Sequence, residues 1–401
     1  MKAGWKRTTL GDAFSTMTGG TPPKGNSELY GDFLPFVKPP ELRDGTIESA
    51  EDGLSVEGAA VARTLPPNSI LVSCIGNLGK IGLNTVPVAF NQQINAILPD
   101  ESKALPWFMF YQGLSATFRD QLESQASGTT VSIVNKSKFN HIEIVLPPLP
   151  EQQRIVAILD EAFDGIATAR ANAEQNRQNA RALFESHLQS VFTEQGQGWV
   201  DNKLKAITTK IGSGATPRGG EESYKAEGIS LIRSLNVHDM GFKYAKLAFL
   251  DDAQADDLSN VEVKARDVLL NITGASVARC CIVPDDVLPA RVNQHVSIIR
   301  PLQDVLAPEF LHYLLISKPY KDKLLQTGEE GGSTRQAITK AQIQDFNVTY
   351  PAFMDDQLTV VTKLDSMLTE TQRLESLYQQ KIAALDELKK SLLHQAFSGA
   401  L

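Results

Sequence analysis

The chain has 401 residues, of which 42% are hydrophobic and 21% are charged, and its formal net charge is −8. This length exceeds one ordinary hydrophobic core and predicts two or more domains. No run approaches the ~18–20 apolar residues of a membrane span, and the N-terminal residues lack an apolar signal segment, so we expect a cytoplasmic protein without membrane contact. The acidic balance disfavours nucleic-acid binding over the whole surface but is compatible with one local basic face.

The first 150 residues indicate a mixed, β-rich domain. Runs such as "SILVSCIG", "INAILP" and "IEIVLP", bounded by Gly, Pro, Asn or Asp, predict strands. A helical pattern at "LPWFMFYQGLSATFRDQLE" precedes a Gly/Ser/Thr loop at 127–137. The segment "LPPLPEQQRIVAILD" at 146–160 then ends the domain and begins a long helix, because proline fits the first helical turn and disfavours helix in the residue before it.

The second half of the chain repeats the first in the same order. For example, "FNQQINAIL" at 90–98 aligns with "VNQHVSIIR" at 292–300, and residues 151–192 align with 356–397 without a gap. We therefore predict an α+β fold in which one β-rich mixed domain followed by one long helix is used twice. The predicted segments are 1–150, 151–197, 198–354 and 355–401.

Both long helices carry apolar residues at spacings of three, four or seven, which is coiled-coil periodicity. The first stripe comprises Ile155, Leu159, Ala162, Ile166, Ala169, Ala173, Ala180 and Leu183. The second comprises Val360, Leu364, Met367, Leu374, Tyr378, Leu385, Leu388 and Leu392. Because small residues predominate in the middle of one stripe and large ones in the other, we expect the two helices to pack against each other. The alternative is that each helix folds back onto its own domain.

Polar residues suited to nucleic acid recur at corresponding loops of the two copies. Lys, Arg and Gly-loop amides suit phosphates, whereas Arg, Asn and Gln discriminate base edges. The first copy offers Thr21, Lys24, Lys38, Arg43, Asn77, Lys80, Gln92, Thr130 and Lys136. The second offers Thr216, Arg218, Arg233, Asn236, His238, Arg279, Gln294, Thr334, Arg335 and Lys340. A solvated turn or a satisfied buried amide is the competing interpretation for each residue, and Asn91 and Asn293 in particular fit it. Two readers tuned to different DNA sequences would nevertheless show this pattern.

Few residues suggest catalysis. "GNLGKIG" at 76–82 resembles a phosphate cradle, but Ile81 stands where a P-loop needs Ser or Thr for magnesium, so a turn between strands is favoured. "EVK" at 262–264, behind Asp256 and Asp257, could form a nuclease carboxylate–lysine set but has no counterpart in the first copy. We expect no catalytic residue, no metal and no cofactor.

Cys74, Cys280 and Cys281 are too few for a disulfide framework and lack the C-x-x-C spacing of zinc ligands. They are expected to be buried, reduced thiols.

Over essentially its full length, the chain resembles the specificity subunit of Type I restriction–modification systems. The matching residues are "LPPLPEQQRIVAILD", the preceding "SGTTVSIVNKSKFNHIEIVLPPLP", the turns "GGTPP" and "GATPR", and the C-terminal "LKKSLLHQAFSGAL". The resemblance implies two target recognition domains, each reading half of a split double-stranded DNA site. It also implies that the two helices pair antiparallel between these domains, in a pseudo-twofold arrangement.

The resemblance further implies that catalysis resides in partners. These are modification subunits, two of them, which carry the adenine-N6 methyltransferase centre, and restriction/translocase subunits. The chain departs from the family at "PAFMDDQ" (351–357), where a proline-rich Glu-Gln segment would be expected at the start of the second helix. Two alternatives stay open: a coiled-coil scaffold or decoy relative that no longer reads DNA, and a stand-alone nuclease centred on residues 262–264.

Overall fold

A computed structural model describes residues 4–128, 130–329 and 337–401 of the chain. It divides into two compact units. Unit 1 comprises Met1–Gln175 together with Tyr378–Leu401, and unit 2 comprises Asn176–Leu377. Each unit therefore holds one β-rich domain and one part of each of the two long helices. Among the described residues, none of the helices combines the length and the apolar character needed to cross a bilayer.

The β-rich part of unit 1 contains two sheets and a strand pair. The larger sheet has the order β2-β10-β7-β8-β4, the smaller has the order β5-β3-β9-β6, and β1 pairs with β11. The strands are β1 (Lys6–Thr9), β2 (Ser15–Thr18), β3 (Tyr30–Val37), β4 (Gly45–Ile47), β5 (Gly53–Leu54), β6 (Thr64–Leu65), β7 (Ile70–Ser73), β8 (Ile81–Asn84), β9 (Val88–Phe90), β10 (Ile94–Leu98) and β11 (Glu143–Leu146). The short helices are α1 (Leu10–Ala13), α2 (Val56–Val61), α3 (Pro106–Leu114), α4 (Ala116–Ser124) and α5 (Lys136–Asn140). Apolar residues of β7, β8 and α3 share one hydrophobic cluster.

Unit 2 is assembled in the same way. Its sheets have the orders β13-β22-β19-β20 and β17-β14-β21-β18, β12 pairs with β23, and β15 pairs with β16. The strands are β12 (Trp199–Lys203), β13 (Thr208–Ser213), β14 (Ile229–Ile232), β15 (Val237–His238), β16 (Gly241–Phe242), β17 (Ala248–Leu250), β18 (Glu262–Val263), β19 (Val268–Asn271), β20 (Cys280–Ile282), β21 (Ala290–Val292), β22 (Val296–Pro301) and β23 (Asn347–Pro351). The short helices are α7 (Asp252–Asp257), α8 (Pro308–Ile316), α9 (Lys318–Glu329) and α10 (Lys340–Asp345).

The strand orders confirm the predicted internal repeat. The two central strands are parallel in the β5-β3-β9-β6 sheet of unit 1 and in the β17-β14-β21-β18 sheet of unit 2, where β3 pairs with β9 and β14 with β21. The same local signals shape the helices: Pro106 and Pro308 each occupy the first turn of a helix, and Ser115 and Ser317 each end that helix. Proline suits this place because its missing N–H has no partner in the first turn anyway. Both units therefore use one design, a mixed α+β domain joined to long helices.

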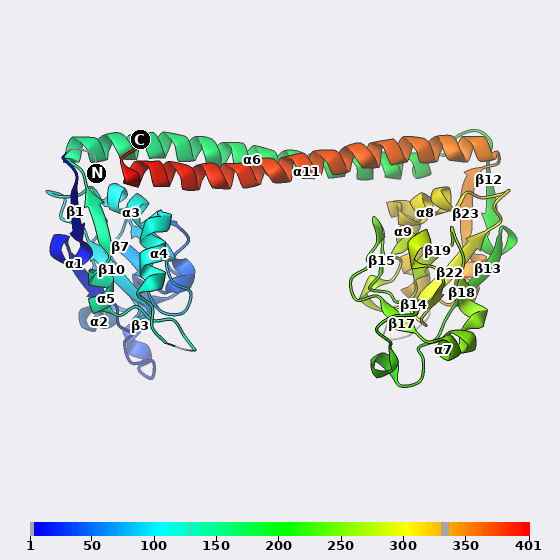
Figure 1. The fold of residues 1–401 in the computed structure, drawn as a ribbon, viewed down its shortest axis with the longest axis horizontal. Coiled ribbons are helices and arrows are strands. Elements are labelled where there is room, and N and C mark those ends of the chain that lie inside the picture. The colour runs from blue at the N-terminus through cyan, green and yellow to red at the C-terminus, as the bar shows by residue number, and fades with distance from the viewer. Residues whose placement is uncertain (1–3, 129, 330–336) are drawn as a thin grey trace. The chain divides into compact units, whose positions relative to one another are not determined.

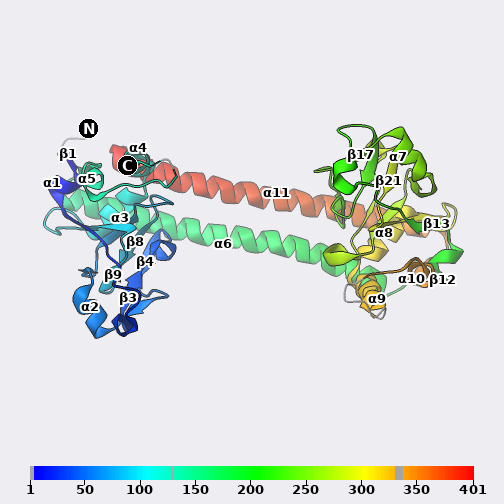
Figure 2. The ribbon, with the colours of Figure 1, turned by 90° about the horizontal axis from the view of Figure 1, so that it is seen from below.

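The long helices are α6 (Leu149–Thr193) and α11 (Met354–Ser398), which pack together within each unit (Figure 1, Figure 2). In unit 1, Ile155 of α6 shares a hydrophobic cluster with Leu393 of α11. In unit 2, Leu188 of α6 shares a cluster with Leu364 of α11. The start of one helix therefore meets the end of the other in each unit. The predicted antiparallel pairing is confirmed.

The phase of the predicted stripes is partly wrong. Leu183 and Leu388 were predicted to lie in the packed stripes of their helices, but they are 66% and 46% exposed. The prediction missed Thr371, Ile382 and Leu393, which are buried instead. A straight helix drifts by about 20° per heptad relative to a strict seven-residue repeat, so an apolar spacing extrapolated over many turns leaves the interface.

A buried glutamine holds the start of each long helix. The amide nitrogen of Gln152 donates to the carbonyl oxygens of Lys103 (2.9 Å) and Pro147 (2.8 Å), and its amide oxygen accepts from the backbone N–H of Leu105 (2.9 Å). These bonds satisfy backbone groups that are shielded from water where the helix meets the domain.

Gln357 makes the equivalent three bonds in unit 2, to the carbonyl oxygens of Val305 and Pro351 and from the N–H of Ala307, all at 2.9 Å. The residues around Gln357 depart from the expected proline-rich pattern, but the start of α11 keeps the geometry of α6. The glutamine amide therefore determines the geometry where the domain joins the helix, and the neighbouring residues do not.

Candidate nucleic-acid interface

In unit 1, several of the predicted loops meet at one edge of the two sheets. The N–H of Gly20, after β2, donates to the carbonyl of Phe90 at the end of β9 (2.9 Å). The N–H of Asn91 donates to the carbonyl of Val37 at the end of β3 (3.0 Å). The loop after β7 joins the same edge, because the N–H of Cys74 donates to the carbonyl of Gln93 (2.8 Å). It also contacts the 127–137 loop through the N–H of Gly76, which donates to the carbonyl of Ser132 (2.9 Å). Loops far apart in the sequence thus form one continuous edge.

The same edge forms in unit 2 through bonds between the corresponding loops. The N–H of Gly214 donates to the carbonyl of Asn293 (3.1 Å), and the N–H of Asn293 donates to the carbonyl of Ile232 (3.1 Å). A Cβ atom at Gly214 would lie 1.6 Å from the carbonyl oxygen of Val292, and one at Gly19 in unit 1 would lie 2.1 Å from that of Asn91. Only glycine allows the first loop to approach the strand ends this closely.

A threonine–glutamine pair lies at this edge in each unit. The Thr21 hydroxyl donates to the amide oxygen of Gln92 at 2.5 Å. In unit 2 the Thr216 hydroxyl donates to the amide oxygen of Gln294 in the same way. Both glutamines are exposed. The hydroxyl occupies the amide oxygen of each glutamine and leaves the amide N–H groups as the donors that suit acceptors on a base edge. The amide nitrogen of Gln294 also lies 3.2 Å from Nε2 of His295.

The amides beneath these glutamines are structural. The amide oxygen of Asn91 accepts from the N–H of Gln93 (3.0 Å), and that of Asn293 accepts from the N–H of His295 (3.0 Å). Both asparagines are buried. They shape the turns that carry Gln92 and Gln294, as the competing interpretation expected.

The second loop of the edge differs between the units. In unit 1, Lys38 forms an ion pair with Asp52, and its backbone N–H donates to the Glu41 carboxylate (2.9 Å). Arg43 lies exposed further along this loop, where its Nε donates to the carbonyl of Pro40 (3.3 Å).

In unit 2, Arg233 stands at the position of Lys38 and is largely enclosed. The Arg233 side chain is only 12% exposed, donates to Glu221 and to the carbonyl of Lys246 (both 2.7 Å), and stacks 5.1 Å from the centre of the Tyr224 ring. Its Nε is buried without a partner. Arg233 therefore supports the loop from within.

Two further predicted residues follow Arg233. Asn236 is fully buried, with its amide oxygen accepting from the N–H of Arg233 (3.0 Å) and its amide nitrogen donating to the carbonyl of Lys243 (2.8 Å). His238 is half-buried, and its Nε2 lies 3.1 Å from the carbonyl of Leu235. Asn236 thus shapes the loop and presents no amide group to solvent.

Most of the other predicted residues are described by the structure and are exposed or half-buried. In unit 1, the exposed or half-buried ones are Lys24, Asn77, Lys80, Thr130 and Lys136. In unit 2 they are Arg218, Arg279 and Lys340. Thr334 and Arg335 fall outside the described residues. Residues 76–82 include the turn between antiparallel strands β7 and β8, which confirms the turn interpretation over the phosphate cradle.

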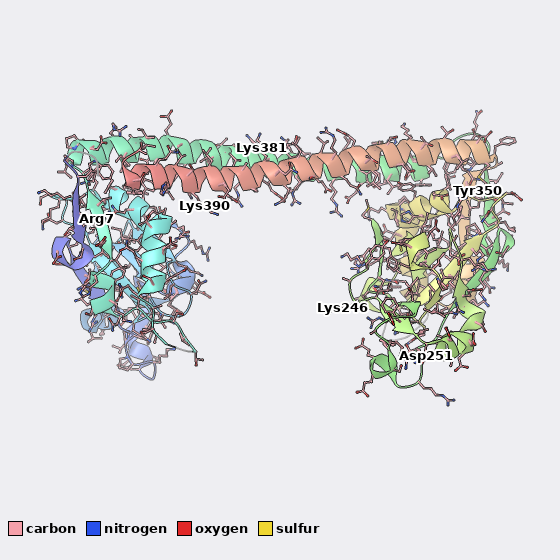
Figure 3. The ribbon with its side chains drawn as sticks, in the orientation of Figure 1. Arg7, Lys246, Asp251, Tyr350, Lys381 and Lys390 are labelled. Atoms are coloured by element: carbon pink, nitrogen blue, oxygen red, sulfur yellow. The ribbon has the colours of Figure 1, made fainter. Side chains whose placement is uncertain are left out.

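The sequence prediction missed a segment of unit 2 that borders Arg233. Met240 and Tyr244 are exposed large side chains, and Lys243 is also exposed. Lys246, labelled in Figure 3, is exposed as well. The alternation of basic and aromatic residues in "MGFKYAK" was a usable signal, since both types suit nucleic acid. The prediction missed this segment because it rested on residues that recur in both copies, and this segment has no counterpart among the residues predicted in the first copy.

The described residues offer little chemistry. Among them, no group of three or more His, Cys, Asp or Glu side chains is placed to hold a metal ion. The three cysteines are free and buried, as predicted. Burial raises the pKa of Cys74 and of Cys281 to about 12 and that of Cys280 well above its usual value. These thiols therefore stay protonated at neutral pH. Because only the thiolate is strongly nucleophilic, they are poor nucleophiles.

Comparison with known proteins finds one family throughout. A model described as the Type I restriction modification DNA specificity domain matches residues 2–175. The HindI specificity subunit of Haemophilus influenzae is 34% identical over 168 residues, which span 40% of this chain and 36% of that protein. The EcoBI specificity subunit of Escherichia coli is 22% identical over 424 residues, covering 99% of this chain and 86% of that protein.

The fold matches as well. A chain solved in work on complex assembly and conformational transition of the type I R-M system superposes with a TM-score of 0.80 at 20% sequence identity. The match covers 100% of this chain and 99% of that one. The similarity therefore extends over both β-rich domains and both long helices.

Proposed function

Because this chain belongs to the family of Type I restriction–modification specificity subunits, we propose that it recognises a bipartite double-stranded DNA target, with one half-site for each unit. It acts as a non-catalytic reader and scaffold, with DNA methylation and cleavage carried out by modification and restriction/translocase partners. A cytoplasmic location follows, because its DNA and partners are found there.

One observation carries the proposal. Both units present a glutamine, Gln92 or Gln294, that a threonine holds at the same edge, while the neighbouring loops differ. The next residue, for example, is Gln93 in unit 1 and His295 in unit 2. An identical frame with different side chains around one fixed donor suits two related readers of two different sequences. Lys38, Arg43 and His238 complete the proposed reading surface, and Arg233 supports its loop from within.

The direct test is selection and sequencing of DNA bound by the chain in complex with its modification subunits. We expect two short conserved blocks separated by unspecified bases. Recovery of random sequence would instead support the scaffold or decoy alternative. Metal-dependent cleavage by the purified chain alone would support the nuclease alternative.

Single substitutions assign the half-sites. Gln92→Ala should relax preference at one position of one half-site, and Gln294→Ala should do the same in the other, each by ~1–3 kcal/mol of discrimination. Gln153→Ala, an exposed glutamine on α6, is the matched control and should change neither. Equal losses at both half-sites from either reading variant would defeat the assignment.

We also propose that the paired helices set the spacer between the half-sites. The two helices have the same length, 45 residues each, as a shared ruler requires. Inserting one heptad at facing positions of α6 and α11 keeps the pairing and should lengthen the spacer in the selected DNA. An unchanged spacer would count against this role.

Exposed leucines at equivalent positions support docking of two copies of one partner. Leu183 on α6 and Leu388 on α11 are equivalent in the repeat and face solvent. We propose that each contacts one modification subunit. Leu183→Glu or Leu388→Glu should reduce the number of bound modification subunits, measured by native mass spectrometry, while Leu302→Glu, an exposed leucine outside the helices, should not. Full occupancy in all three variants would overturn this assignment.

A further inference from the structure

The two long helices carry opposite charges at positions where they face each other. In unit 1, Arg170 of α6 forms an ion pair with Asp386 of α11. The repeat relates residue 170 to residue 375 and residue 386 to residue 181. The equivalent pair in unit 2 is therefore Glu375 and Arg181, with the charges exchanged between the repeat positions.

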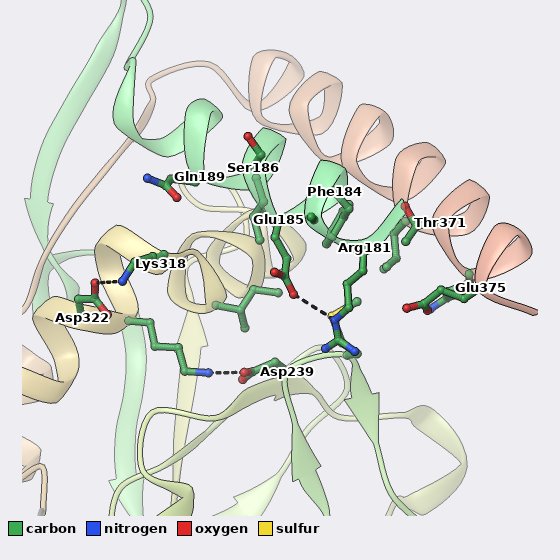
Figure 4. A pocket seen from close by; sticks show the side chains of 17 residues that line it. Arg181, Phe184, Glu185, Ser186, Gln189, Asp239, Lys318, Asp322, Thr371 and Glu375 are labelled. Carbon is green, nitrogen blue, oxygen red and sulfur yellow. Dashed lines mark hydrogen bonds and ion pairs between the residues drawn. The ribbon is translucent and has the colours of Figure 1, made fainter. Parts of the chain in front are cut away.

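Unit 2 places these two residues around one cavity of about 650 Å³, between the helices and the domain (Figure 4). Arg181 comes from α6 and Glu375 from α11, and both line the cavity. Arg181 donates to Glu185 on its own helix at 3.1 Å. Glu375 lines the same cavity with the opposite charge, and opposite charges attract beyond contact distance.

The consequence is that α6 is positive at both contact positions and α11 is negative at both. A pairing of α6 with α6 of a second chain would bring Arg170 opposite Arg181 twice. A pairing of α11 with α11 would bring Asp386 opposite Glu375 twice. Among these four residues, only the pairing of α6 with α11 places opposite charges together, and like charges at helix interfaces are destabilising.

Side-chain size agrees with the charges. Ala173 and Ala180 of α6 are buried, whereas the equivalent positions of α11 are Tyr378 and Leu385. Two copies of α6 would leave voids along this stripe, and two copies of α11 would be crowded there. Size and charge thus favour the same partner.

We propose that Arg170, Arg181, Glu375 and Asp386 make α6 and α11 selective for each other and disfavour pairing of α6 with α6, or of α11 with α11, between two copies of the chain. Without this selection, the repeat itself would invite exchange, because two chains could swap equivalent helices into the same geometry. The proposal is independent of DNA reading.

The test uses the full chain with Arg170→Asp and Glu375→Arg combined, which leaves the formal net charge unchanged. Each facing pair within the chain then becomes like-charged, while α6 with α6 and α11 with α11 become opposite-charged. Sedimentation velocity at low ionic strength should show that the association constant for dimerisation is at least about tenfold higher than that of the unsubstituted chain. High salt should remove the increase, because these side chains are solvent-accessible.

Adding Arg181→Glu and Asp386→Arg gives the matched control, because all four charges are then reversed and the selection is restored. This variant should be as monomeric as the unsubstituted chain. Equal dimer content in the double and quadruple variants would overturn the proposal. If circular dichroism shows that the double variant does not fold, a second double variant, Arg170→Asp with Asp386→Arg, replaces it. This second variant keeps opposite charges facing each other within the chain and also places opposite charges together when α6 pairs with α6 or α11 with α11. No more dimer than in the unsubstituted chain would then refute the proposal.

Discussion

The second edge loop shows how the two units differ. In unit 1 the Glu41 carboxylate accepts from the N–H of Lys38 at 2.9 Å, and in unit 2 the equivalent Asn236 accepts from the N–H of Arg233 at 3.0 Å. The bond that shapes the loop is kept, while a carboxylate has become an amide and Lys has become Arg. The local geometry of this loop is therefore kept, while the side chains at both positions have changed.

The junction between domain and helix shows the opposite behaviour. Gln152 and Gln357 make the same three bonds, and the Tyr111 and Tyr313 hydroxyls donate to Asp160 and to its equivalent in α11. The two copies agree at their helix junctions and diverge at their edges. This contrast is what a shared scaffold with two separate reading surfaces requires, and it can be broken or sharpened by substitution.

The largest effect should come from the buried glutamines. Gln152→Ala or Gln357→Ala leaves two carbonyl groups and one N–H without partners, and should lower the free energy of unfolding by about 2–4 kcal/mol. Gln153→Ala, the exposed neighbour, should change it by less than about 0.5 kcal/mol. Urea denaturation provides the measurement. A small loss in either buried variant would mean that water replaces the glutamine there.

A difference in acid sensitivity should follow from His312 of unit 2, whose counterpart in unit 1 is the buried Phe110. Burial lowers the pKa of His312 from its usual 6.5, so the folded state disfavours the protonated ring. Below about pH 6.5 the unfolded chain binds a proton that the folded chain resists, and stability falls by up to about 1.4 kcal/mol per pH unit until the folded pKa is reached.

His312→Phe, which copies unit 1, should remove this acid-dependent loss. The measurement is thermal unfolding between about pH 5 and 8. The Nε2 of His312 lies 3.0 Å from the carbonyl of Asp239, so the variant also loses one hydrogen bond, and the slope with pH rather than the absolute stability decides the outcome. An unchanged slope would assign the acid sensitivity to other groups.

The smallest effect concerns an ion pair that both units contain. Arg119 pairs with Asp44 in unit 1 at 2.7 Å, and Lys321 pairs with Asp239 in unit 2. The unit 2 side chains are less exposed, at 28% and 27% against 39% and 40%. Lys321→Ala should therefore cost slightly more than Arg119→Ala, both within about 1 kcal/mol and both reduced by salt. Double-mutant cycles with Asp44 and Asp239 measure the interaction energy of each pair. A larger energy for the unit 1 pair would show that solvent exposure does not govern these interactions.

The sequence predicted the repeat, the two long helices and many strands, because these depend on local patterns. Prolines mark the start of α3 and α8, and apolar runs mark the buried strands such as β7 and β19. The phase of the helix stripe was less predictable, as the exposed Leu183 and Leu388 show. Phase errors accumulate along a helix, whereas strand patterns are short enough to escape them.

The predicted reading residues divide in the same way. Their position in loops followed from the sequence, since Gly, Pro and polar residues mark the turns on which they stand. Whether a side chain is presented to solvent did not: Gln92 and Gln294 are exposed, whereas Asn236 is buried and Arg233 is held by Glu221 and Tyr224.

The sequence by itself determined that one domain–helix design occurs twice and that its edges carry different polar residues. Only the tertiary structure decided which residues act together. The bonds of Gln152 to Lys103, of Thr21 to Gln92 and of Arg170 to Asp386 join residues that lie far apart in the chain. Local patterns record the conformation of a segment, but the partner of a polar side chain is set by the packing of several segments, and the fold alone supplies that information.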